Sequence, residues 1–241
     1  MKFDRVRIGT LFFAIALIGL GTEHFVFGEF ITGRAPAWPA GAPGKAVFAA
    51  LTGVIFIAVG LSLLIRKGVR PAAIVAAILI GAWALLRHIP VLFAEPFLSG
   101  AWTRAGKALV FVGGSLAISG ARAKLSITIG RCSLGLFLFI SGVQHFLFAK
   151  FVASLIPTWF PGPAMFWTYF AAVALICGGI GLWIPYTARL AALWSGIMIF
   201  SWFWIVHIPR VGVGMSDQIA VFEALAFSGI AFVLSGRDGT P

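Results

Sequence analysis

The sequence predicts an all-α transmembrane protein of eight helices, arranged as two parallel-repeat four-helix bundles. Composition is the first reason: 61% of the 241 residues are hydrophobic and 10% are charged, whereas soluble domains are about 25% charged. Spacing is the second, because the apolar residues fall into eight runs close to the roughly 20 residues that a helix needs to cross a bilayer. The third is that the pattern of the first half returns in the second.

The first half contains four of these runs. The run at 7–30 follows a basic amino terminus and resembles a secretory signal, but its later part recurs in mid-chain, so we expect a retained helix. The prolines of 33–44 cannot continue a helix and predict a loop. A basic turn, and then a loop with Glu95 and Pro96, separate the other three runs, which are 46–65, 71–93 and 104–118.

The second half repeats this order after a basic junction at Arg122 and Lys124. The first run of this half is followed by another proline-rich loop, as in the first half. The last two runs are separated by a short polar stretch. The predicted helices of this half are 126–151, 164–184, 188–208 and 217–235.

Direct comparison of the halves indicates a tandem duplication. Residues 21–38 and 142–159 share seven of eighteen positions, including a Gly-x-x-His-Phe element in each. We therefore predict two repeat units, 1–121 and 122–241. An even number of helices per unit gives both copies the same orientation, so the expected symmetry axis lies along the membrane normal.

The distribution of basic residues predicts the orientation. Of the 18 Lys and Arg residues, eleven lie on one predicted side: ten at the termini, the basic turns and the junction, and Arg131 near the start of the helix that follows the junction. The positive-inside rule then places both termini in the cytoplasm, and we expect a bacterial inner (cytoplasmic) membrane. The net charge of +11 is assigned to lipid headgroups, and nucleic acid is excluded as a partner because no basic, hydrated domain is present.

The chain has four histidines, and each has a counterpart in the other half. They are His24 with His145, and His88 with His207. Each lies late in an outward-running helix, so we expect one layer of imidazoles in the outer half of the bilayer. An imidazole at this depth can bind haem iron, hydrogen-bond a quinone, relay protons, or cap backbone carbonyls in a purely structural role, and all of these readings stay open.

Charged residues inside the helices suggest ion pairs. Glu23 beside His24 and Arg87 beside His88 are both lost in the second half, so a buried Glu23–Arg87 pair is the simplest hypothesis. This asymmetry predicts that the strongly polar site belongs to the first half. Lys107 and Glu223, at matching positions of the last helix of each half, form a second candidate pair between the bundles.

The sequence lacks the motifs of several common kinds of catalytic and binding site. Cys132 and Cys177 are not paired in sequence, and no metal-binding motif, phosphate loop, nucleophile motif or carboxylate cluster occurs. The sequence therefore assigns no catalytic residue and no metal site, and it leaves open whether the protein is an enzyme.

The Gly-x-x-His-Phe element, a Pro-x-Trp loop, an Arg-Ala turn and a later His-Ile-Pro resemble the DoxX-like membrane proteins, over essentially the whole chain and twice. The resemblance implies a four-helix unit, here doubled. Some relatives are subunits of quinone-linked sulfur oxidation or associate with redox complexes. Since a fold alone does not fix a mechanism, the substrate, partner proteins and oligomeric state are left open.

Three functions are consistent with these observations. The first is a redox-associated membrane subunit that contacts quinone or haem through His24, His88, His145 and His207, with membrane redox proteins as partners. The second is a non-catalytic accessory or scaffold protein with structural histidines. The third is a conductor of small solutes or ions through the polar layer.

Overall fold

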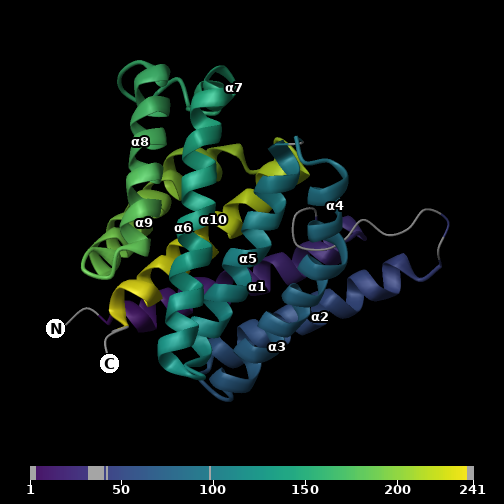
Figure 1. Cartoon of the computed structure of the whole chain (residues 1–241). Coiled ribbons are helices and arrows are strands. Elements are labelled where there is room, and N and C mark those ends of the chain that lie inside the picture. Colours follow the sequence, from purple (N-terminus) through teal and green to yellow (C-terminus); the bar gives the residue numbers. More distant parts are fainter. Residues whose placement is uncertain (1–3, 32–40, 42, 98, 238–241) are drawn as a thin grey trace.

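The computed structural model describes residues 4–31, 41, 43–97 and 99–237, and their regular structure is entirely helical (Figure 1). The predicted all-α class is therefore confirmed. The predicted loop at 33–44 lies largely outside the described residues. The helices are α1 (Arg5–Phe27), α2 (Lys45–Leu64), α3 (Val69–Trp83), η1 (Ala84–His88), α4 (Ile89–Ala94), α5 (Ser99–Ser119), α6 (Ala123–Leu147), α7 (Ala149–Ser154), α8 (Ala164–Trp183), α9 (Ala188–Trp202), η2 (Phe203–His207), η3 (Ile208–Arg210) and α10 (Met215–Gly236).

Within the described residues, seven helices are long and apolar enough to cross a membrane, one fewer than predicted. The continuous helices 69–94 and 188–210 each count as one span. The eighth predicted run forms α5, which has 21 residues but includes Arg104 and Lys107 and many small residues. Its Ala, Val and Phe side chains are largely buried, so α5 needs little of the apolar surface that lipid-facing helices carry.

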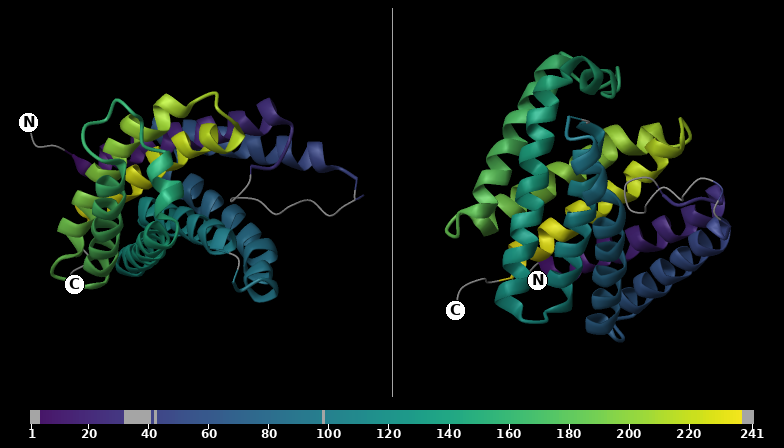
Figure 2. Two further views of the ribbon diagram at one scale, coloured as in Figure 1. Left: turned by 90° about the horizontal axis from the view of Figure 1, so that it is seen from above. Right: turned by 45° about the vertical axis from the view of Figure 1, so that its right-hand side comes forward.

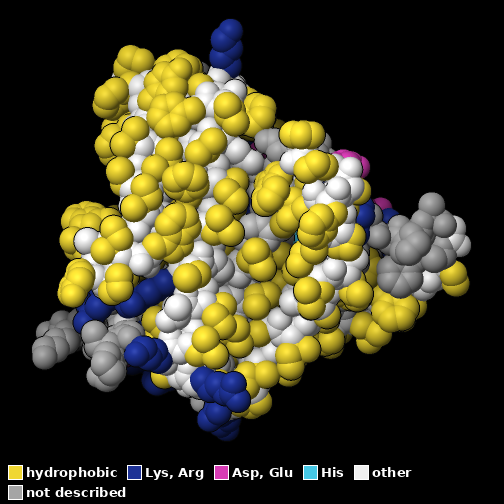
Figure 3. Space-filling model, in the orientation of Figure 1, with side chains coloured by type: hydrophobic (Ala, Val, Ile, Leu, Met, Phe, Trp, Pro, Cys, Tyr) yellow, Lys and Arg dark blue, Asp and Glu magenta, His cyan; other side chains and the backbone are white. Residues whose placement is uncertain are grey.

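The surface agrees with contact to a lipid bilayer. Figure 3 shows hydrophobic side chains over most of one face, while most of the Lys and Arg side chains in this view gather at the lower edge. An exposed apolar area of this extent is unusual for a soluble monomer and is expected for a membrane protein. Exposed side chains on the long helices include Val26, Leu61, Ile78, Leu86, Phe166, Leu190 and Trp204.

The helices do not form two self-contained four-helix bundles. α1 packs against α2 and α10, and α6 packs against α8 and α5, so the first helix of each half contacts the last helix of the other half. α5 and α10 also contact each other. They lie between α1–α3 on one side and α6, α8 and α9 on the other (Figure 2). α10 is the most central span, with 78% of its apolar stretch buried against 28–44% for the others.

Glycines explain this exchange of partners. A Cβ atom on Gly9 of α1 would lie 2.3 Å from the carbonyl oxygen of Gly229 on α10. A Cβ atom on Gly130 of α6 would lie 3.1 Å from the carbonyl oxygen of Gly113 on α5. Small residues allow helix backbones to approach closely in membranes. Both crossings between the halves therefore depend on a pair of glycines.

Arginine side chains link the basic ends of the helices by donating hydrogen bonds to backbone carbonyls. Arg189 donates to the carbonyl of Ser235 at 3.2 Å, and Arg237 donates to that of Ile118 at 3.2 Å. A Cβ atom on Gly236 would lie 3.4 Å from the Cβ atom of Arg5. The start of α1 and the ends of α5 and α10 consequently lie on the same side of the molecule.

Two π-helical turns, η1 and η2, interrupt the spans 69–94 and 188–210 just before a proline. In each, an isoleucine N–H donates to the carbonyl five residues earlier: Ile89 to Ala84, and Ile208 to Phe203. Pro90 and Pro209 follow these isoleucines and have no N–H of their own. A proline ring clashes with the carbonyl four residues earlier in a regular helix, and a wider turn relieves that clash.

Candidate functional site

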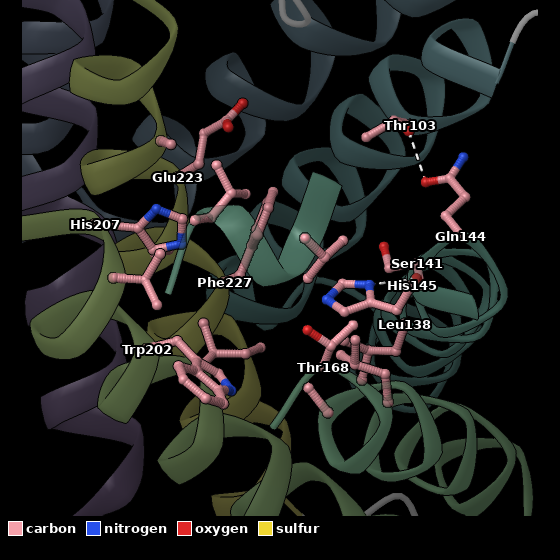
Figure 4. Close-up of a pocket in the computed structure, with 18 of the residues that line it drawn as sticks. Thr103, Leu138, Ser141, Gln144, His145, Thr168, Trp202, His207, Glu223 and Phe227 are labelled. Atoms are coloured by element: carbon pink, nitrogen blue, oxygen red, sulfur yellow. Dashed lines mark hydrogen bonds between the residues drawn. The ribbon is translucent and has the colours of Figure 1, made fainter. Parts of the chain in front are cut away.

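A cavity of about 590 Å³ lies among α5, α6, α7, α8, α9, η2 and α10, largely in the second half of the chain. Figure 4 shows its polar side chains at the edges and aromatic and aliphatic side chains between them. This composition is typical of sites for hydrophobic small molecules. The large apolar residues of its wall include Phe137, Leu138, Phe148, Phe151, Leu155, Trp167, Leu175, Trp202 and Phe227.

His145, in the last turn of α6, faces the cavity. Its Nδ1 lies 2.7 Å from the carbonyl oxygen of Ser141, one turn earlier. A carbonyl can only accept a hydrogen bond, so Nδ1 carries the proton and donates it. In the neutral ring Nε2 is then an acceptor, and Figure 4 shows this nitrogen pointing into the cavity.

His207 lines the opposite side of the same cavity and ends the π-helical turn η2 (Figure 4). Its ring is half-buried, and it forms no hydrogen bond with another described residue. The charges of Glu223 and Lys107 act on it. Trp202, one residue before the π turn, lines the cavity beside it. The widened turn therefore determines the direction in which this imidazole points.

An ion pair between the central helices lies at the cavity. Lys107 Nζ on α5 is 2.6 Å from Glu223 Oε2 on α10, and the Glu223 side chain is only 5% exposed. This confirms the pair that the sequence suggested between the halves. Because each residue neutralises the other, this edge of the cavity is polar but carries no net charge from the pair.

Thr103 and Gln144 form a second polar contact at the cavity. The Thr103 hydroxyl donates to Gln144 Oε1 at 2.9 Å and joins α5 to α6 (Figure 4). Gln144 occupies the position that Glu23 has in the first half. Thr103 and Trp202 were not among the predicted site residues, although a polar residue in an apolar helix is the signal that singles out Thr103.

The first-half histidines lie elsewhere. His24 is 1% exposed, and its Nδ1 lies 2.8 Å from the carbonyl oxygen of Leu20, which repeats the His145 geometry. The rings of Phe56 and Phe30 pack edge-on against it, at centroid distances of 5.6 and 6.3 Å. His88 is 6% exposed at the end of η1. The structure thus brings His145 and His207 to one cavity and leaves His24 and His88 outside it.

The hypothesised Glu23–Arg87 ion pair does not form between these two residues. The ion pairs that join described residues to one another are Lys45–Glu29, Lys107–Glu223 and Arg210–Asp217. Successive helix positions point in different directions, and in η1 it is His88 that faces inward while Arg87 is half-exposed. The cavity described above lies mostly in the second half, and the expectation that the strongly polar site belongs to the first half stays a prediction.

In the described part of the chain, no group of three or more His, Cys, Asp or Glu residues is arranged to hold a metal ion. Cys132 and Cys177 are both free and exposed. The polar groups at the cavity are imidazole, indole, amide and hydroxyl groups, together with the Lys107–Glu223 pair.

Comparison with known proteins gives one match. The model of a family described as "Domain of unknown function (DUF8561)" matches residues 134–216. No curated protein and no solved structure matches the chain. The matched segment contains both cavity histidines, His145 and His207, whereas Lys107 and Glu223 lie outside it.

Proposed function

We propose that the chain is a DoxX-like, redox-associated subunit of a bacterial inner membrane that binds a quinone in the His145–His207 cavity. The observation that carries this proposal is an apolar cavity of about 590 Å³ inside a membrane protein, with an imidazole on each side. Small-molecule sites commonly have about 300–1,000 Å³ and a few polar groups that orient the ligand.

The proposed topology has eight crossings, with α5 as an internal eighth helix, and two repeats at 1–121 and 122–241. Both termini are cytoplasmic. The support is the grouping of basic residues: the starts of α1 and α6 and the ends of α5 and α10 share a side that is rich in Lys and Arg. Such residues are retained on the cytoplasmic side of membranes.

Haem is the second candidate ligand, and it has its own support. The Nε2 atom of His145 points into the cavity with its lone pair free of the Ser141 contact, which is the form of imidazole that binds haem iron. His207 lies across the cavity from it. A haem-loaded protein is distinguished from a quinone-loaded one by its colour.

The test is direct analysis of purified full-length protein in mild detergent. We expect quinone or its reduced quinol form in the lipid extract, or binding of the added ligand. In His145→Ala the affinity for the quinol should fall about tenfold, because a hydrogen bond in a buried site contributes about 1–1.5 kcal/mol. His24→Ala is the matched control, since His24 occupies the equivalent helix position outside the cavity.

Absorbance near the Soret band of the same preparation tests haem. A folded protein that is colourless and binds no quinone would overturn the proposal. An accessory protein or a conductor would then be the remaining readings, and solute flux into proteoliposomes distinguishes these two.

A further inference from the structure

The hydrogen-bonding polarity of His145 restricts what can bind beside it. Its Nδ1–H is used by the Ser141 carbonyl at 2.7 Å, within the same helix. The matching bond of His24 to Leu20, at 2.8 Å, shows that the arrangement follows from the local helix geometry. The neutral ring therefore presents only an acceptor, Nε2, to the cavity.

The polar side chains discussed here donate their hydrogen bonds to groups other than His145 Nε2. Lys107, which also lines the cavity, is held in its 2.6 Å pair with Glu223. The Thr103 hydroxyl donates to Gln144, and the Thr168 hydroxyl donates to the carbonyl of Ala164 at 3.0 Å. A donor for His145 Nε2 is thus best supplied by the ligand.

The opposite side of the cavity offers hydrogen-bond donors. His207 and Trp202 line it and form no hydrogen bond with other described residues, so each brings an N–H that can serve a ligand oxygen. A phenolic hydroxyl can both donate to His145 and accept from this side. A quinone carbonyl can only accept, and placing it against Nε2 would bring two acceptors together.

We propose that the cavity selects ligands with a hydroxyl donor on an aromatic head, and so binds the quinol form in preference to the quinone. This inference rests on the proposed function and makes it more specific. The aromatic residues of the wall, Phe137, Phe148, Trp202 and Phe227, suit a flat ring.

The experiment compares three ligands on the wild-type, full-length protein under anaerobic conditions. They are a benzoquinol with an alkyl tail, the corresponding quinone, and the dimethyl ether of the quinol, which has the same ring but no O–H. We expect the quinol to bind about tenfold more tightly than either of the others, because a buried acceptor without a donor costs about 1–3 kcal/mol.

A variant adds an independent readout. The amide of Gln in His145→Gln supplies both a donor and an acceptor, so quinone and quinol should then bind with similar affinity. His24→Gln, at the matching position outside the cavity, should keep the preference of the wild type. Isothermal titration or equilibrium dialysis measures all of these affinities.

The outcomes separate the inference from the function on which it rests. Equal wild-type affinity for quinol and quinone, or tighter binding of the dimethyl ether, would overturn the selectivity and leave a quinone site standing. Failure of all three ligands to bind folded protein would remove the quinone site itself, and the inference with it.

Discussion

At the cavity, Ser141 acts on the proposed ligand site through its backbone carbonyl. That carbonyl fixes the tautomer of His145 at a distance of 2.7 Å, and the tautomer in turn decides which kind of group the imidazole can bind. The sequence could place His145 in an apolar helix, but it could not show which of the four histidines would face a cavity, because this depends on how the helices pack.

The Lys107–Glu223 pair leads to a prediction about stability. Lys107→Met removes the 2.6 Å partner of a carboxylate that is 5% exposed, and we expect the free energy of unfolding to fall by about 3–5 kcal/mol. Removing both charges in Lys107→Met/Glu223→Leu should restore most of this loss. Thermal unfolding in detergent measures each variant.

A surface pair provides the control for this prediction. Lys45 and Glu29 are also in contact, at 2.8 Å, but their side chains are 44% and 52% exposed. Lys45→Met should therefore cost at most about 1 kcal/mol. If Lys107→Met were as mild as Lys45→Met, the central pair would have no special structural role.

At the scale of single helices, the sequence predicted the positions of the helices well and the local geometry of their backbone less well. The run at 46–65 became Lys45–Leu64, while the run at 126–151 is divided, because Phe148 leaves helical geometry between α6 and α7. Apolar periodicity marks where a helix is buried, but it does not detect one residue with a different backbone conformation.

The π-helical turns belong to the same scale, and Pro209 allows a test. In Pro209→Ala the chain regains an N–H, and η2 should tighten to a regular helix and rotate His207 away from the cavity. We expect the affinity for the bound ligand to fall about tenfold, the equivalent of one hydrogen bond, while thermal stability is unchanged or higher. Ligand titration and thermal unfolding measure the two effects.

Pro90 follows the equivalent turn η1 in the first half, away from the cavity. Pro90→Ala should leave ligand affinity unchanged, which makes it the matched control. Retained affinity in Pro209→Ala would show that the widened turn does not orient His207 for binding.

At the scale of the whole molecule, the contact between the first and last helices closes the fold. Gly9→Ala would place a methyl group 2.3 Å from the Gly229 carbonyl oxygen and 2.8 Å from the Val233 nitrogen, both backbone atoms. Overpacking of this kind typically costs about 1–3 kcal/mol. We expect a corresponding decrease in the free energy of unfolding, measured by thermal or denaturant unfolding.

Gly81 provides the control within a helix. A Cβ atom there would find its nearest neighbour at 3.8 Å, an ordinary contact with Val112. Gly81→Ala should be neutral or stabilising by up to about 1 kcal/mol, because alanine is the better helix former. Equal effects of the two substitutions would contradict the close approach of α1 and α10.

The exchange of helix partners between the halves could not be predicted from the sequence. Repeat comparison identifies equivalent helices, such as α1 with α6, but equivalence does not say whether α1 packs on the last helix of its own half or of the other. The glycines that decide this are Gly9, Gly113, Gly130 and Gly229, and in sequence they resemble the other glycines of a glycine-rich membrane chain.

Positions 107 and 223 match each other when the two halves are aligned, and in the structure their side chains meet. In an assembly of two identical copies, the residues meeting here would be the same, and two lysines or two glutamates would repel each other. A lysine facing a glutamate requires the two positions to be encoded separately. Joining both halves in one polypeptide therefore permits opposite charges at a place where symmetry between identical subunits would forbid them.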